Sequence, residues 1–133
     1  MHDAQPQDPG SRQAAHETAA LPKPTVGVEV FQSLDVRVGR ILEARSAPKA
    51  RKPAYQLTID FGPLGIRRSS AQITHYYEPD SLAGTLVVAV VNFPPRLVAG
   101  FRSEVLVLGA MESDGRVVLL RPDRPCEPGL PIG

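Results

Sequence analysis

A single cysteine, Cys126, is present in the chain of 133 residues. One thiol excludes an intrachain disulfide and a cysteine-based zinc site, which is typical of a reducing compartment. Long apolar runs are also missing, since the longest, over residues 86–91, is far too short to cross a bilayer. The N-terminus holds no apolar stretch of the kind found in signal peptides. We therefore expect a cytoplasmic protein that does not insert into membranes.

A large excess of charge of one sign is also missing. The formal net charge is +1 at pH 7, well short of a strongly basic nucleic-acid binder. The distribution is uneven, because residues 1–30 carry two more acidic than basic side chains and the remainder carries three more basic than acidic ones. Any surface that attracts an anionic partner must therefore be a local patch.

Motifs that carry catalysis are missing too. Asp35, Asp60 and Glu104 lie in or beside expected strands, and no recognisable motif pairs two of them for general acid–base work. His75 has no partner motif that would make it a metal ligand or a member of a catalytic triad. No glycine-rich phosphate loop followed by a helix occurs. We expect no enzymatic activity, no metal site and no cofactor.

The composition divides the chain near residue 28. Residues 1–27 are rich in alanine, glutamine and proline and have almost no apolar periodicity, which is typical of a disordered leader. Residues 28–133 are long enough for one domain with its own hydrophobic core. We therefore expect a disordered N-terminal leader over 1–27 and a single folded domain over 28–133.

Short strands separated by turn signals fill the folded domain. Apolar and polar residues alternate over 34–38 and most clearly over 55–61. Further strands are expected over 66–73, 85–93, 103–111 and 116–120, with a short helical segment over 74–84. Gly39, at a slip of the apolar phase, predicts a bulge in the first strand. The pattern predicts an all-β fold, a five-stranded OB-fold barrel with a short helical segment between strands three and four, plus a proline-rich C-terminal extension.

Basic and short polar side chains gather in the loop over 49–52 and in the strand over 67–72. In OB-folds, the loop between the first two strands is one wall of the oligonucleotide site. Arginine matches phosphate, and short hydroxyls suit a ribose. Because neighbouring strand residues face opposite ways, only residues 67, 69 and 71 or residues 68, 70 and 72 can line a groove. An ordinary solvated strand face is an equally good reading of this spacing.

A third group of candidate residues follows the apolar strand over 85–93. Asn92 and Arg96 flank two prolines, and Pro95 fixes an extended path that presents Arg96 from a stiff loop. Apolar residues nearby predict an exposed patch, which marks an interaction surface. We expect this patch to bind a polypeptide or, as the preferred reading, to form a dimer interface. The patch consists of Phe93, Pro94, Pro95, Leu97 and Val98.

Five blocks of the sequence resemble the tRNA-binding-domain family, whose members include small bacterial proteins, C-terminal domains of some methionyl- and phenylalanyl-tRNA synthetases and the EMAP-II-like cytokines. The similarity runs in order and without large gaps from about Val28 to Gly133, and the leader has no counterpart. The blocks are residues 31–41, 50–62, 69–74 (SSAQIT), 89–96 (AVVNFPPR) and 103–109 (SEVLVLG).

The resemblance implies an OB-fold that binds tRNA through its shape and not by reading a sequence. For the small bacterial members it also implies a homodimer, with the terminal segments in the interface, and a chaperone role toward unfolded or pre-export polypeptides. The RNA-binding residues that it implies are Arg37, Lys49, Arg51, Lys52, Arg67, Arg68, Ser69, Ser70, Gln72, Asn92, Arg96 and Ser103.

One departure from the family pattern concerns the fifth strand. Many members have Gly-Met after the serine that corresponds to Ser103, whereas this chain has Glu104-Val105. The resemblance therefore places an acid near the RNA face, where repulsion of phosphate would weaken binding. Three hypotheses stay open: a tRNA-binding, chaperone-like dimer; an export chaperone with little RNA binding; and a structural OB module that binds neither.

Overall fold

The computed structural model describes residues 21–133. The predicted leader over 1–27 lies mostly outside the described residues, so this prediction stays open. Residues 21–27 form neither helix nor strand, and their side chains are exposed. In the described part of the chain, no helix is long and apolar enough to cross a membrane.

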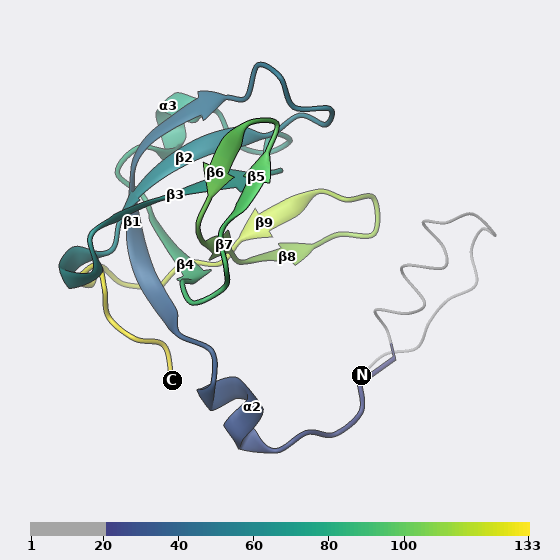
Figure 1. Cartoon of the computed structure of the whole chain (residues 1–133), viewed down its shortest axis with the longest axis vertical. Coiled ribbons are helices and arrows are strands. Elements are labelled where there is room, and N and C mark those ends of the chain that lie inside the picture. Colours follow the sequence, from purple (N-terminus) through teal and green to yellow (C-terminus); the bar gives the residue numbers. More distant parts are fainter. Residues whose placement is uncertain (1–20) are drawn as a thin grey trace.

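Antiparallel strands form a nearly closed barrel, with two further hairpins on its surface (Figure 1). The hydrogen-bonded strand order is β3-β2-β1-β4-β7. The elements are α2 (Val28–Gln32), β1 (Val36–Ser46), β2 (Tyr55–Asp60), the 3-10 turn η1 (Gly62–Leu64), β3 (Ile66–Ala71), α3 (Pro79–Leu82), β4 (Leu86–Val90), β5 (Arg96–Val98), β6 (Phe101–Ser103), β7 (Leu106–Val107), β8 (Gly109–Met111) and β9 (Val117–Leu119). The predicted all-β, OB-type fold with a short helix between the third and fourth strands is confirmed.

The barrel closes where β3 meets the segment over 103–105, through a mixture of backbone and side-chain hydrogen bonds. The N–H of Glu104 donates to the carbonyl oxygen of Arg68 at 2.8 Å. In return, the N–H of Arg68 donates to the Glu104 carboxylate at 2.9 Å. The N–H of Ser70 donates to the Ser103 hydroxyl at 2.9 Å. We call this line of contacts the β3 seam. Side chains satisfy β3 backbone groups that a continuous strand ladder would otherwise pair.

Alternation along β2 builds the centre of the core. Leu57, Ile59 and Phe61 point inward and are fully buried, as the two-residue period predicts. Gly39 of β1 lies against this cluster, because a Cβ there would come within 2.6 Å of Ile59 and 2.7 Å of Phe61. The prediction of a bulge at Gly39 is wrong in its position, since the register of β1 against β2 shifts between residues 41 and 43. Gly39 is needed for close packing and not for a bulge.

Two hairpins extend beyond the barrel. The expected strand over 103–111 is interrupted, and its residues contribute to β6, β7 and β8. The β5–β6 hairpin, which the sequence pattern did not predict, turns through Ala99 and Gly100, whose φ angles of 52° and 83° both lie in the left-handed region. Positive φ at both turn residues matches the twist of a two-residue hairpin. The Asp114-Gly115 turn between β8 and β9 was predicted, and it is confirmed.

The C-terminal extension lies along the edge of β1. The N–H of Gly129 donates to the carbonyl oxygen of Val38 at 2.7 Å, and the N–H of Val38 donates to that of Leu130 at 3.0 Å. The N–H of Ile132 donates to the carbonyl oxygen of Val36 at 2.8 Å. In Figure 1, α2 and the C-terminus lie at the same end of the molecule, and α2 projects away from the barrel. None of the α2 residues is buried.

Candidate nucleic-acid interface

Alternation along β3 decides which of the expected residues can meet a ligand. Ser69 and Ala71 face the barrel interior and are 1% and 8% exposed. The intervening Arg68 and Ser70, and Gln72 just after the strand, therefore lie on the outer side, exposed or half-buried. The outer face of β3 carries one cation and two short polar groups in a row, spaced at about 7 Å.

The two neighbouring arginines have different surroundings. The Arg68 guanidinium lies over the ring of Phe101, 4.4 Å from its centroid, which holds the cation against the outer face. Arg67 is half-buried at the end of the barrel, where a terminal nitrogen is 3.4 Å from the carbonyl oxygen of Leu64. Arg68 is therefore the arginine that the outer face of β3 presents.

Basic loops border this face on both sides. The loop over 47–54 carries Lys49, Arg51 and Lys52, which are all exposed. On the opposite side, the β5–β6 hairpin carries Arg96 and Arg102, which are also exposed. A hollow of about 370 Å³ lies between the two borders. It is lined by Lys49, Ala50, Arg51, Lys52, Ala54, Ser70, Gln72, Val98 and Ala99.

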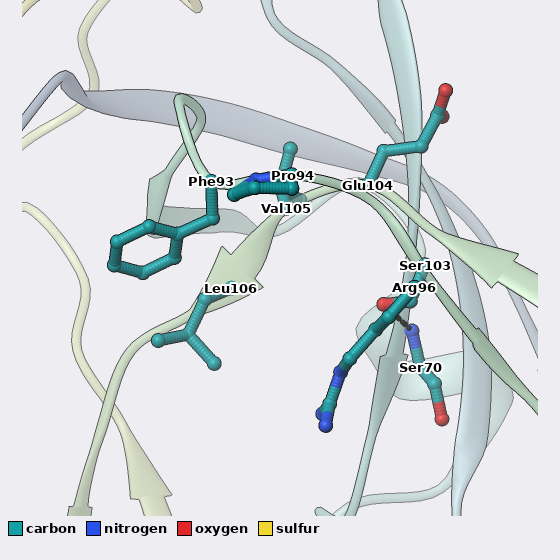
Figure 2. A pocket seen from close by; sticks show the side chains of 8 residues that line it. All are labelled: Ser70, Phe93, Pro94, Arg96, Ser103, Glu104, Val105 and Leu106. Carbon is teal, nitrogen blue, oxygen red and sulfur yellow. Dashed lines mark hydrogen bonds between the residues drawn. The ribbon is translucent and has the colours of Figure 1, made fainter.

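A second hollow, of about 300 Å³, opens at the base of the β5–β6 hairpin (Figure 2). Figure 2 shows the apolar side chains of Phe93 and Leu106 on one side and those of Arg96 and Ser70 on the other. Because Ser70 also lines the first hollow, the two are neighbours along β3. The second hollow therefore combines an apolar surface with a cation.

Two serines that were expected to contact RNA are built into the barrel. Ser69 is 1% exposed, and its hydroxyl donates to the carbonyl oxygen of Val105 at 3.0 Å. Ser103 is 6% exposed, and its hydroxyl accepts the N–H of Ser70. Their burial takes both hydroxyls away from the outer face and gives them a structural role at the β3 seam.

Arg37 and Asn92 also make structural contacts. The Arg37 guanidinium pairs with Asp35 and donates to the carbonyl oxygen of Gly129 at 2.9 Å, which holds the C-terminal extension. The Asn92 side chain accepts the N–H of Asp35 at 2.8 Å and donates to the carbonyl oxygen of Ser33 at 3.0 Å. Asn92 therefore fixes the entry into β1, on β1's side of the barrel and not on β3.

The structure gives Glu104 a role that the sequence did not reveal. Its carboxylate accepts the N–H of Arg68, and it is 3.8 Å from the guanidinium nitrogen of Arg102. Its side chain is 28% exposed. The acid expected near the RNA face is thus a component of the β3 seam. Arg102, its ion-pair partner, is a surface cation that sequence reasoning missed, although its position between buried Phe101 and Ser103 is a recognisable two-residue alternation.

The apolar patch expected around the prolines is exposed. Phe93 is 43% exposed and Leu97 is 73% exposed. Pro94 and Pro95 are also exposed, and Val98 is half-buried. A separate apolar surface lies on α2, where Val28, Val30 and Phe31 are 69%, 50% and 45% exposed. The apolar surface of α2, within the described residues, is one that the sequence did not indicate.

The described residues also show how possible metal ligands and titratable groups are distributed. They contain no group of three or more His, Cys, Asp or Glu side chains that could hold a metal ion. Burial raises the pKa of Tyr55, whose hydroxyl donates to the carbonyl oxygen of Tyr77 at 2.6 Å, so the phenol is a structural donor. The outer face gathers cations, hydroxyls and amides, which bind anions and sugars, and the Glu104 carboxylate lies at its border.

Comparison with known proteins gives the same picture. Residues 36–131 match the family model described as "Putative tRNA binding domain". The chain is 50% identical to the chaperone CsaA from Bacillus anthracis strain Ames, covering 83% of this chain and 100% of that one with a TM-score of 0.80. It is 49% identical to the CsaA chaperone protein from Picrophilus torridus, covering 82% of this chain and 100% of that one with a TM-score of 0.77.

Among curated relatives, the chain is 36% identical over 122 residues to the methionine–tRNA ligase of Porphyromonas gingivalis. This match covers 92% of the chain but 18% of the ligase, so the chain spans less than a fifth of the length of that relative. The predicted resemblance to small bacterial members of the tRNA-binding-domain family is confirmed by the family match and by the two CsaA structures.

Proposed function

Because the chain belongs to the tRNA-binding-domain family, we propose that it binds tRNA across the outer face of β3, recognising the shape of the molecule and not its sequence. It acts as a binding module in the cytoplasm, without catalysis of its own. The proposed contacts are Lys49, Arg51, Lys52, Arg68, Ser70, Gln72, Arg96 and Arg102, and Arg67 is left out because it lies off this face.

The arrangement that supports this proposal is a polar floor between two basic borders. Ser70 and Gln72 offer groups suited to a ribose hydroxyl, while the loop over 47–54 and the β5–β6 hairpin offer cations to phosphate. This local cluster of cations is sufficient despite the low net charge, because affinity for the RNA backbone depends on the number of phosphates contacted and not on the charge of the whole chain.

Salt dependence tests this function. We expect bulk tRNA to bind saturably and more tightly than a matched DNA hairpin when fluorescence anisotropy is measured from about 50 to 300 mM salt. If about four to six phosphates are neutralised, the slope of log affinity against log salt is roughly −3 to −5. A slope near zero, or equal binding of the DNA hairpin, contradicts the proposal.

The two arginines of β3 supply a matched pair of variants. Arg68→Ala removes the exposed cation over Phe101, and we expect it to weaken tRNA binding by about tenfold and to reduce the salt slope by about 1. Arg67→Ala removes a half-buried cation at the end of the barrel, and we expect a clearly smaller loss. Negligible loss in both variants removes β3 from the interface.

A second candidate function is the binding of unfolded polypeptide. The exposed Phe93, Pro94 and Leu97, together with the similarity to two chaperones, favour it. Because apolar contacts depend little on salt, such binding should persist at concentrations that release tRNA. The test is light scattering by a denatured client with and without the protein. Unchanged aggregation, or protection that Leu97→Asp leaves intact, argues against this function.

We also propose that the protein is a homodimer. The exposed apolar surface of α2 and the exposed Leu130 and Ile132 of the C-terminal extension support this, because none of the apolar side chains of α2 is buried in the described chain. Sedimentation velocity tests the proposal, with Phe31→Glu expected to give monomers. A monomer at every concentration of the unmodified chain refutes it. A dimer that survives Phe31→Glu but is lost in Leu97→Asp moves the interface to the patch around Phe93.

A further inference from the structure

A third hollow adjoins the outer face of β3 and is built partly from the β8–β9 hairpin. Its volume is about 500 Å³, larger than the other two. One side belongs to the loop over 47–54 and the segment after β3, and the other belongs to the turn between β8 and β9. The lining residues are Lys52, Pro53, Gln72, Thr74, His75, Asp114, Gly115 and Arg116.

The third hollow is the neighbour of the central hollow along the outer face of β3. Ser70 lines both the hollow beside Phe93 and the central one, while Gln72 and Lys52 line both the central hollow and the third one. The outer face of β3 thus runs through three hollows in succession. Beyond Gln72, this face leads into the hollow that Lys52 and Arg116 line.

Hydrogen bonds hold the far side of the third hollow in position. The Tyr76 hydroxyl donates to the Glu112 carboxylate at 2.6 Å, which ties the β8–β9 hairpin to the segment after β3. The Arg116 side chain pairs with Asp114 at 2.8 Å, and the Arg116 N–H donates to the same carboxylate at 3.1 Å. The guanidinium is therefore oriented before any ligand arrives, which lowers the ordering cost of binding.

We propose that the third hollow is a subsite for one unpaired nucleotide of the RNA bound across β3. Lys52 and Arg116 face its phosphate from opposite sides, and Gln72, Thr74 and His75 meet its sugar and base. Asp114 and the nearby Glu112 limit the positive charge, which suits one nucleotide and not a cluster of phosphates. This subsite rests on the proposed tRNA-binding function and extends it, because it assigns the β8–β9 hairpin a part in binding and adds a single-stranded contact to recognition by shape.

The test compares a blunt RNA hairpin with the same hairpin carrying unpaired extensions of one to four nucleotides at either end. Affinities are measured by fluorescence anisotropy, and the readout is the ratio of extended to blunt affinity. We expect an extension at one end to raise affinity, and Arg116→Gln to lower that ratio by about three- to tenfold. The matched control is Arg124→Gln, which removes the same charge from an exposed residue outside the three hollows and should not change the ratio.

Two further variants distinguish loss of a nucleotide contact from a structural disturbance of the β8–β9 hairpin. His75→Ala lies on a different segment and should lower the ratio too, while Arg116→Lys should restore part of it. If the blunt hairpin and tRNA bind but the ratio is unchanged in Arg116→Gln and His75→Ala, the subsite is refuted and the proposed function stands. If Arg124→Gln lowers the ratio as much as Arg116→Gln, the effect is general charge and the subsite is refuted as well. If no RNA binds, the proposed function itself fails.

Discussion

Substitution of Glu104 separates two effects of a single carboxylate. The side chain accepts the N–H of Arg68 at the β3 seam, and its charge lies beside the proposed RNA face. Alanine removes both the acceptor and the charge, whereas glutamine keeps an acceptor oxygen and removes only the charge. Comparison of Glu104→Ala with Glu104→Gln therefore measures barrel closure and phosphate repulsion separately.

The stability cost follows from the hydrogen bond. A hydrogen bond to a charged group contributes about 1.5–3 kcal/mol, and the 28% exposure of Glu104 places it toward the lower end of that range. We expect Glu104→Ala to cost about 1–2 kcal/mol of unfolding free energy, which lowers the melting temperature by roughly 5–10 °C in a domain of this size. Glu104→Gln should cost less than about 1 kcal/mol. Thermal and urea unfolding measure both.

Removal of the Glu104 charge should strengthen tRNA binding, whereas loss of its hydrogen bond lowers stability. A unit charge about 8 Å from a phosphate in water repels it by about 0.5 kcal/mol, so Glu104→Gln should raise tRNA affinity by about twofold at low salt. The gain should disappear at high salt, where the Debye length is short. Equal unfolding free energies for Glu104→Ala and the unmodified chain would refute the role of Glu104 in closing the barrel. A loss of tRNA affinity in Glu104→Gln would refute the repulsion.

Three further predictions concern packing, backbone strain and titration. Gly39→Ala should cost about 1–3 kcal/mol in urea unfolding, because the added methyl group overlaps Phe61 in the core. Ala99→Gly should raise the unfolding free energy by about 0.5 kcal/mol, since glycine adopts the φ of 52° without strain. The hydrogen bond to Glu112 raises the pKa of Tyr76 above its ordinary 10.0. This hydrogen bond is therefore intact below pH 10 and is lost as the pH rises through the raised pKa of Tyr76. Glu112→Gln should lower the pKa of Tyr76 in a phenolate absorbance titration.

Local patterns were sufficient for the elements that carry a clear period. The alternation over 55–61 predicted β2 and its inward face, and the Asp114-Gly115 pair predicted the β8–β9 turn. The β5–β6 hairpin was missed because its turn contains Ala99, an alanine in the left-handed region, where glycine or asparagine would have given a signal. Strands of three residues are too short to show a period.

The exposure of several cations in the candidate site was predictable from the sequence, whereas Arg102 and the hydrogen-bond partners of the site residues were not. Lys49, Lys52 and Arg68 are exposed, as composition and position suggest. The burial of Ser69 and Ser103 could not be predicted, because a serine is equally suited to a ribose and to a buried carbonyl oxygen. Which use applies depends on the phase of β3 and on a contact with a segment more than 30 residues away. Such pairings become visible only in three dimensions.

The β3 seam explains how binding and stability share one strand. Inward Ser69 and the backbone groups of Arg68 and Ser70 close the barrel, while the outward side chain of Ser70 lines two hollows and that of Arg68 lies over the ring of Phe101. Because the hydrogen bonds of the seam use the backbone of Arg68 and Ser70 and the inward hydroxyl of Ser69, the outward side chain of Gln72 can change without removing any of them, whereas Arg68 also covers Phe101 of β6. Variants of Gln72 should therefore alter binding more than stability, whereas variants of Ser69 should do the reverse.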